Sequence, residues 1–211
     1  FPRPPGDVGN PATWPCASRA KVVEPADVAA VVREGPLPET LVEAFIAAGR
    51  ELAAEGATLI TTSCGFLVTA QRALAEALPV PLVTSSLLQI PALQSGLPPG
   101  RRVGVITFDA RRLGPAHLAA AGAPADTPVA GLEDGGELHR VIARDLPLLD
   151  ERAAEADVLA AGRALQAAHP DLGAVVRECT NLPPSRAALS RALGLPVHDL
   201  QTLLRARLGG A

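Results

Sequence analysis

Two cysteines occupy matching positions in an internal repeat. With Cys64 placed on Cys179, an offset of 115 residues, the segment CGFLVTAQRALAEALPVP reads against CTNLPPSRAALSRALGLP without a gap, and seven of eighteen positions are identical. Each segment follows a short apolar run that begins after a Gly-Ala pair. We therefore predict two related halves, each carrying a thiol where a parallel strand ends and a helix begins.

Thiols at such positions suit acid–base chemistry on carbon. Open α/β sheets bind ligands at the carboxyl edge of their strands, and the N-terminus of a following helix lowers the pKa of a thiol. If the two halves face each other, Cys64 and Cys179 lie on opposite sides of one cleft, where one thiolate removes a proton from carbon and the opposite thiol delivers one. The alternative for a strand-end cysteine is a small buried hydrophobe. We assign that packing role to Cys16, which has no counterpart in the repeat.

The chain around these cysteines alternates short apolar runs with helical patterns, which is typical of a mostly parallel α/β architecture. The predicted strands cover residues 20–23, 58–62, 80–83, 102–108, 127–131, 172–178 and 197–200. The predicted helices cover residues 39–55, 66–78, 87–93 and 115–122, part of 148–169, and residues 185–193 and 203–208.

The repeat and the order of elements predict two pseudo-symmetric α/β lobes, with the active site in the cleft between them. Each lobe is expected to hold a mainly parallel sheet flanked by helices. Residues 1–97 together with 196–211 are assigned to the first lobe and residues 98–195 to the second, because the chain is expected to cross back after residue 196. One further strand of the first lobe is expected before Phe1, since the sequence opens within a Pro-rich loop.

Composition argues against several classes of protein. The 211 residues carry a net charge of −3 and are 48% hydrophobic, so a packed core can form, and neither nucleic acid nor membrane is an expected partner. Three cysteines without a C-x-x-C pair indicate reduced thiols in a cytoplasmic protein. GxGxxG and P-loop patterns do not occur, and His117, His139 and His169 lack ligand spacing, so neither a cofactor nor a metal is predicted.

The motifs around the two cysteines resemble those of the aspartate/glutamate/hydantoin racemase superfamily. They are TTSCGF (61–66), RVGVITF (102–108), ECTNLPP (178–184) and GLPVHD (194–199), and the resemblance extends over essentially the whole chain. It implies a cofactor-independent, homodimeric enzyme of two pseudo-symmetric α/β domains, with Cys64 and Cys179 as its catalytic cysteines. The segments PPGDVGNPATW (4–14) and TSSLLQIPAL (84–93) resemble a branch of bacterial racemase-like proteins, which the algal dimethylsulfoniopropionate lyases also resemble.

Several positions depart from the pattern of the glutamate and aspartate racemases. Those enzymes usually follow the first cysteine with Asn-Thr, which grips the substrate carboxylate, whereas Gly65-Phe66 stands here and makes free glutamate a less favoured substrate. Glu178 precedes the second cysteine, where a small or apolar residue is common. Because neighbouring residues on a strand point to opposite faces, its role stays open between structural and functional. Ser185 stands where relatives of the branch often have a tyrosine.

Further candidates for substrate binding lie at strand ends and in the N-terminal loop. Asp7 lies in a segment that resembles the substrate-binding loop of the superfamily, with stabilisation of a turn as the alternative. The strand-end hydroxyl groups are candidate donors to a carboxylate, with helix capping as the alternative, and His198 is a candidate for orienting a thiol or the substrate. The predicted substrate-binding set is Asp7, Thr62, Ser63, Gly65, Ser85, Thr107, Thr180, Asn181 and His198.

The sequence therefore predicts a racemase- or epimerase-type enzyme that abstracts a proton alpha to a carboxylate or carbonyl of an amino acid, a hydantoin or a related small acid. Elimination of the dimethylsulfoniopropionate-lyase type, decarboxylation and cis–trans isomerisation at the same site are alternatives. A non-catalytic two-lobed protein that binds a small ligand is the alternative of a different class. Since a carboxylate raises the pKa of a nearby thiol, Cys64 is expected to be the readier thiolate and Cys179, beside Glu178, the readier acid.

Overall fold

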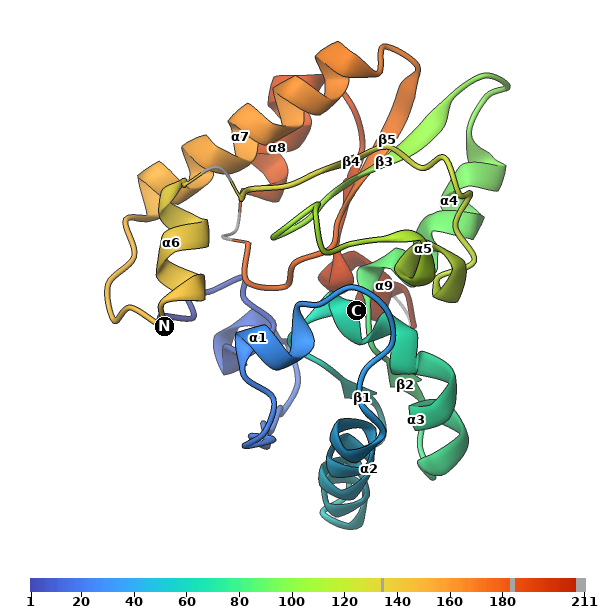
Figure 1. The fold of residues 1–211 in the computed structure, drawn as a ribbon, viewed down its shortest axis with the longest axis vertical. Helices are drawn as coiled ribbons and strands as arrows, with labels where there is room; N and C mark the ends of the chain where they lie inside the picture. The colour runs from blue at the N-terminus through green and yellow to red at the C-terminus, as the bar shows by residue number, and fades with distance from the viewer. Residues whose placement is uncertain (134, 183–184, 208–211) are drawn as a thin grey trace.

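The computed structural model describes residues 1–133, 135–182 and 185–207, and its strands form two parallel sheets (Figure 1). The smaller sheet pairs β1 (Ile60–Thr61) with β2 (Leu82–Val83). The larger sheet has the order β4-β3-β5-β6, formed by β4 (Val129–Ala130), β3 (Arg102–Ile106), β5 (Leu172–Arg177) and β6 (Val197–His198). The predicted α/β class, with parallel sheets flanked by helices, is confirmed.

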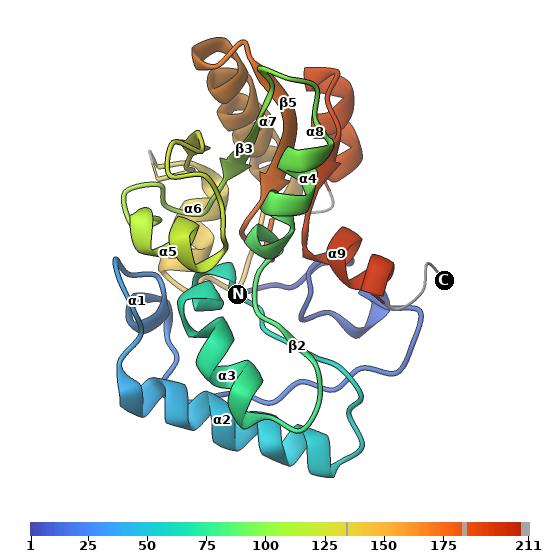
Figure 2. The ribbon, with the colours of Figure 1, turned by 90° about the vertical axis from the view of Figure 1, so that its right-hand side faces the viewer.

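Helices cover both sheets. They are α1 (Val28–Val31), α2 (Glu39–Ala54), α3 (Gln71–Ala77), α4 (Ile90–Gly96), α5 (Pro115–Ala120), α6 (Glu137–Ala143), α7 (Glu151–Ala168), α8 (Arg186–Leu193) and α9 (Leu200–Arg207), with the 3-10 helices η1 (Pro11–Thr13), η2 (Gly65–Ala70) and η3 (Ser86–Gln89). In Figures 1 and 2, α7 and α8 lie along one face of the larger sheet and α4 along the other, while α2 and α3 lie beside the smaller sheet.

The central strands β3 and β5 are buried on both faces, and alternate residues serve different hydrophobic clusters because side chains alternate along a strand. Val105 and Val176 belong to a cluster that also contains Phe66 of η2. Ile106 and Val175 belong to a second cluster, with buried residues of α7 and α8. The first cluster thus runs from the larger sheet to the elements around the smaller one; Cys64 packs against it, whereas Cys179 packs against the second cluster.

The repeat predicted from the sequence recurs in the strand register. Ile60 of β1 pairs with Leu82 of β2, and Val175 of β5 pairs with Val197 of β6. The differences 175 − 60 and 197 − 82 both equal 115, the offset between the two cysteines. The two strand pairs that end at the cysteine loops are therefore counterparts in backbone geometry as well as in sequence.

The same register places β6 in the larger sheet. Residues 196–211 were expected in the first lobe, yet β6 pairs with β5 of the larger sheet. As the counterpart of β2, β6 pairs with the counterpart of β1, which is β5. The following helix α9 does return to the first part of the chain, where Leu200 and Leu204 pack with Val83. The rest of the predicted division stays a prediction.

Some predicted elements differ from the observed ones. Residues 20–23 have no regular structure, because Lys21 forms an ion pair with Glu51 of α2 and Val22 is 76% exposed, so this run borders a helix instead of joining a sheet. The helix α6 was not predicted. Pro183 and Pro184 of the ECTNLPP motif, and Leu208, expected in the last helix, lie outside the described residues.

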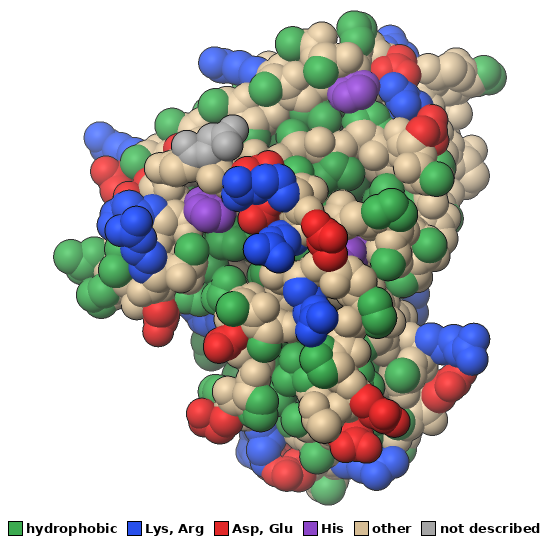
Figure 3. Space-filling model, viewed as in Figure 1, with side chains coloured by type: hydrophobic (Ala, Val, Ile, Leu, Met, Phe, Trp, Pro, Cys, Tyr) green, Lys and Arg blue, Asp and Glu red, His purple; other side chains and the backbone are tan. Residues whose placement is uncertain are grey.

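No helix in the described ranges is long and apolar enough to cross a bilayer. On the face shown in Figure 3, basic and acidic side chains are interspersed.

Candidate active site

Cys64 and Cys179 line one cavity of about 380 Å³. Cys64 lies between β1 and η2, Cys179 follows β5, and both side chains are half-buried. Thr62, Ser63 and Asn181 from the two cysteine loops also line the cavity, together with Glu178. Its remaining wall is largely apolar and includes parts of the N-terminal segment, α1 and α2. The structure thus brings together the two thiols that the repeat singled out.

The two cysteine loops contact each other crosswise. The Thr180 hydroxyl donates a hydrogen bond to the backbone carbonyl of Ser63. Gly65 lies against Glu178, and a Cβ built on Gly65 would be 2.4 Å from Glu178 Oε1. In each contact, the residue after one cysteine meets the residue before the other. Each residue of one contact is the repeat counterpart of a residue in the other contact. The two loops are therefore related as a pseudo-symmetric pair.

Glu178 is the buried charge of the site. Its residue is 1% exposed, and Thr107 Oγ1 donates to its Oε2 at 2.7 Å. Among the residues that the structure describes, none donates a hydrogen bond of normal geometry to Oε1. Burial raises the pKa of the Glu178 carboxyl to about 7, against the opposing effects of the Thr107 hydroxyl and the amides of Phe108 and Gly65. The carboxyl therefore titrates near neutral pH.

The thiols do not have the low pKa values predicted from helix N-termini. Burial raises the pKa of Cys64 and of Cys179, and the charge of Glu178 raises both further. Hydrogen bonds from backbone amides lower the pKa of each thiol, but by less than burial and Glu178 raise it. The physical reason lies in the local structure: Cys64 precedes a 3-10 helix of six residues, and α8 begins at Arg186, well after Cys179. Desolvation outweighs the helix effect at both thiols.

The two thiols differ in their other charged neighbours. Arg3 lowers the pKa of Cys64, whereas Cys64 and Asp7 raise that of Cys179, as smaller contributions than burial and Glu178. Cys179 Sγ lies 4.0 Å from Asn181 Oδ1, to which it donates. Among their smaller neighbours, Arg3 thus favours a thiolate at Cys64, while Asp7 disfavours one at Cys179.

Asp7 combines the two roles considered for it. Its Oδ1 accepts hydrogen bonds from the Gly9 amide at 2.6 Å and from Arg3 Nη1 at 3.0 Å, which stabilises the turn. Its Oδ2 accepts a hydrogen bond from Asn181 Nδ2 at 2.8 Å. Asp7 is 1% exposed, so it acts on the cavity through Asn181 and through its charge.

The remaining predicted residues are divided between the cavity and its support. Thr62 lines the cavity, but its hydroxyl donates to the Thr84 carbonyl at 2.7 Å. Ser85 is buried and its hydroxyl caps η3 by accepting from the Leu87 amide at 3.2 Å, which is the capping alternative. Thr107 is buried and holds Glu178 by donating a hydrogen bond to its Oε2. His198 lies on β6, is half-buried, and is not among the residues that line the cavity; burial chiefly lowers its pKa.

Sequence reasoning left two residues out of the site. Glu178 was considered but left open, and Arg3 was not considered at all. Gly65 carried a usable signal for Glu178, because a glycine at this position leaves room for a side chain from the other loop. Arg3 stands in an irregular segment with no periodic pattern, and its position depends on the Asp7 contact.

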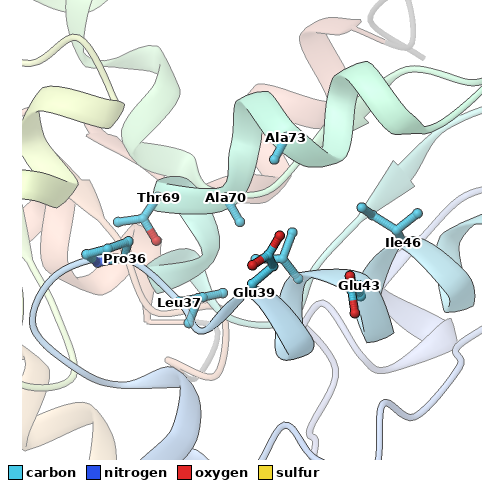
Figure 4. Close-up of a pocket in the computed structure, with 9 residues that line it drawn as sticks. Pro36, Leu37, Glu39, Glu43, Ile46, Thr69, Ala70 and Ala73 are labelled. Carbon is cyan, nitrogen blue, oxygen red and sulfur yellow. The ribbon is translucent and has the colours of Figure 1, made fainter.

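A second hollow, of about 500 Å³, lies between α2 and the η2–α3 segment (Figure 4). Its lining includes Leu37, Ile46 and Ala73 and the carboxylates of Glu39 and Glu43, but neither thiol of the repeat. Although it is larger, it brings together none of the predicted site residues. Within the described residues, no group of three or more His, Cys, Asp or Glu side chains is arranged to hold a metal ion.

The fold is similar to that of arylmalonate decarboxylase and of an aspartate racemase homologue. A variant of arylmalonate decarboxylase in its sulfate-associated form gives a TM-score of 0.60 at 22% identity and covers 86% of this chain and 79% of that one. The aspartate racemase homologue from Pyrococcus horikoshii OT3 gives a TM-score of 0.52 at 19% identity, with 80% of this chain and 74% of that one covered. At these identities the likeness establishes the fold.

The curated relatives in sequence are dimethylsulfoniopropionate lyases. The enzyme of Durusdinium sp. clade D is 30% identical over 202 residues, which are 92% of this chain and 66% of that protein. Dimethylsulfoniopropionate lyase 5 of Emiliania huxleyi is 29% identical over 213 residues, which are 97% of this chain and 42% of that protein. The chain therefore spans less than two thirds of the length of these relatives. No protein-family model matches it.

Proposed function

We propose that this chain, which is similar in fold to an aspartate racemase homologue and in sequence to dimethylsulfoniopropionate lyases, is a cofactor-independent enzyme of the aspartate/glutamate/hydantoin racemase superfamily that removes a proton from a carbon next to a carboxylate. Cys64 and Cys179 are its acid–base pair. The observation that carries the proposal is that both thiols, from repeat-related loops, line one cavity. A cavity of about 380 Å³ has room for a small organic acid.

The first candidate reaction is β-elimination from a carboxylate that bears a sulfonium group, with dimethylsulfoniopropionate as the substrate. One thiolate takes the proton alpha to the carboxylate, the carbon–sulfur bond breaks, and dimethyl sulfide leaves with the electron pair while acrylate forms. The names of the sequence relatives support this choice. So do the charges of the cavity, because Arg3 offers a cation to the carboxylate and Glu178 offers an anion to the sulfonium.

Cys64 is the better base of the two. Arg3 stabilises a thiolate at Cys64, whereas Asp7 destabilises one at Cys179. Elimination does not return a proton to the carbon, so in this reaction Cys179 is not needed as the acid of the pair.

Racemisation is the second candidate, and one observation favours it. Elimination needs one base, while the inversion of a carbon centre needs a base on one side and an acid on the other. Two thiols from pseudo-symmetric loops are the arrangement that inversion requires. Free glutamate is the least favoured substrate, because Gly65 offers no side chain to the carboxylate and Glu178 fills the space beside it.

One experiment separates the two reactions. The protein is incubated in D₂O with dimethylsulfoniopropionate, with single enantiomers of amino acids and with hydantoins, and the solution is followed by proton NMR. Elimination gives acrylate and dimethyl sulfide, whereas racemisation gives deuterium at the alpha carbon together with inversion. If Cys64→Ser and Cys179→Ser both keep full activity on the substrate identified, the proposed acid–base pair is wrong.

A further inference from the structure

Glu178 presents a buried carboxylate to the cavity, and the reaction described above gives this group no part in proton transfer. One oxygen, Oε2, is held by Thr107 at 2.7 Å. The other, Oε1, lies over Gly65 and accepts no hydrogen bond of normal geometry within the described part of the chain. An unsatisfied buried carboxylate oxygen is costly, and such groups concentrate at functional sites. Glu178 also lies among the residues that line the cavity with both thiols.

Each thiol needs a proton acceptor before it can act as a base, and the Glu178 carboxylate can accept a proton. Burial raises both thiol pKa values above their ordinary range, so both sulfurs carry protons at neutral pH. A thiol that keeps its proton is a poor base. Before either cysteine can take a proton from a substrate, its own proton needs an acceptor within the cavity, and bulk water is a poor one for a buried group.

Resting on the proposed function, we propose that Glu178 is that acceptor: a positioning residue that acts through the thiol pair. The Sγ–H bond of Cys64 breaks, an O–H bond forms at Oε1, and the electron pair stays on sulfur. The site carries one negative charge before and after this step, as carboxylate with thiol or as carboxylic acid with thiolate. The thiolate then takes the substrate proton, and in an elimination the proton held by Glu178 leaves to solvent as the net proton of the reaction.

The surroundings of Glu178 fit a shared proton. Cys179 of its own loop and Cys64 of the loop after β1 line the same cavity, and the charge of Glu178 raises the pKa of both thiols. From the N-terminal segment, Arg3 acts on Cys64 and Asp7 on Cys179. Two further charges lie at the adjacent strand ends, where Arg177 pairs with Asp199 at 2.6 Å. With burial raising the pKa of Glu178 to about 7, the carboxyl can both accept and release a proton near neutral pH.

The test is the variant Glu178→Gln, measured first without substrate. Alkylation of Cys64 and Cys179 by iodoacetamide is followed by mass spectrometry between about pH 6 and about pH 10. Removing the charge lowers the thiol pKa values, so both thiols should react faster than in the wild type, by about tenfold for each unit of decrease. Cys16, which is exposed and does not have the packing role expected for it, serves as the reference in the same sample and should react at an unchanged rate.

Turnover should respond in the opposite direction. On the substrate identified, kcat/KM of the wild type should rise with pH through about 7, since Glu178 must be ionised to accept a proton. Glu178→Gln should lose this rise and about 100-fold in kcat/KM. In Thr107→Val the carboxyl remains but loses a hydrogen bond that lowers its pKa, so the rise should move to higher pH. Thr127→Val, which removes a hydroxyl bonded to the Pro124 carbonyl, is the matched control and should keep the wild-type profile.

The outcomes separate this proposal from the proposed function. Unchanged alkylation of Cys64 and Cys179 in Glu178→Gln overturns the role of Glu178, whatever the turnover. Faster alkylation with an unaltered rise of kcat/KM through pH 7 also overturns it. If no candidate acid is turned over at all, the proposed function fails, while the alkylation rates still decide whether Glu178 controls the thiols.

Discussion

The loops after β1 and after β5 share a backbone plan and differ in charge. The position before the cysteine is the exposed Ser63 in the first loop and the buried Glu178 in the second. One residue earlier, Thr62 donates to the backbone carbonyl of Thr84 at 2.7 Å. Its repeat counterpart Arg177 makes the corresponding contact as a buried ion pair.

The partner positions in this contact are also related by the repeat. Asp199, the partner of Arg177, is 115 residues after Thr84, the partner of Thr62. Both contacts tie the end of one strand to the end of its neighbour. In the first half this contact is a hydrogen bond from a neutral hydroxyl, and in the second half it is an ion pair. Both halves therefore keep the contact between strand ends, but only the second half makes it with charged side chains. The charged half lies next to Glu178.

The largest expected effect concerns the cysteines. If the reaction is an elimination with Cys64 as base, Cys64→Ser should lower kcat by about 1,000-fold, whereas Cys179→Ser should lower it by no more than about tenfold, because no proton returns to carbon. Equal losses in both variants would instead point to racemisation. The rates are measured by NMR on the substrate identified, with Cys16→Ser as the matched control that keeps wild-type activity.

Loss of the charged strand-end contact should lower the free energy of unfolding more than loss of the neutral one. Asp199→Ala leaves the buried Arg177 without its carboxylate partner and should lower the free energy of unfolding by about 3–5 kcal/mol. Thr62→Val removes the corresponding neutral hydrogen bond and should cost about 1 kcal/mol. Urea denaturation of both variants checks this. Similar losses in the two would mean that the charge adds nothing to the tie.

Glu178 should also make stability depend on pH. Its carboxyl ordinarily has a pKa of 4.5, and burial in the folded protein raises it to about 7. The folded state therefore holds this proton more tightly than the unfolded state. The resulting stabilisation is present below about pH 4.5, declines as the pH rises, and is lost above about pH 7.

The decline should amount to about 3 kcal/mol and be absent in Glu178→Gln. Urea denaturation of both proteins at about pH 5 and about pH 8 measures the difference. Ser63→Ala, at the repeat counterpart of Glu178, should decline as the wild type does. A wild type and a Glu178→Gln variant with parallel pH profiles would show that the carboxyl does not titrate in this range.

The sequence predicted the parts of this site that repeat and missed the parts that arise between the repeats. The cysteines, the strands before them and the strands β2 and β6 follow from local patterns and from one offset. The crosswise contacts of Gly65 with Glu178 and of Thr180 with Ser63 join segments more than 100 residues apart. Local pattern does not identify the partner in such a contact, although the glycine at position 65 indicates that some group approaches closely there.

The pKa values of the thiols were mispredicted for a related reason. A helix after a cysteine can be read from the sequence, and its effect on the thiol was expected to dominate. How deeply the sulfur is buried, and where the Glu178 carboxylate points, depend on the packing of both halves together. The pairing of β6 with β5 was missed similarly, because strand pairing was not inferred from the repeat.

Gly65 gives the smallest and most local test of the comparison. Its counterpart Thr180 carries a side chain, so the repeat itself does not demand a glycine there. What demands it is Glu178: a Cβ at position 65 would lie 2.4 Å from Glu178 Oε1 and 2.8 Å from both the Glu178 carbonyl oxygen and Ser85 Oγ. Gly65→Ala should therefore lower the free energy of unfolding by about 1–3 kcal/mol through overpacking.

The matched control for this variant is Gly96→Ala, where a Cβ would meet nothing within 4 Å, so stability should stay within about 0.5 kcal/mol of the wild type. Because part of the clash is with the Glu178 carboxyl, the double variant Gly65→Ala/Glu178→Ala should lose less than the sum of the two single losses in urea denaturation. Additive losses would mean that the carbonyl of Glu178 or the Ser85 hydroxyl, and not the carboxyl, requires the glycine. The difference between the two loops would then come from packing against the backbone or Ser85. The Glu178 carboxyl would not limit the size of the side chain beside Cys64.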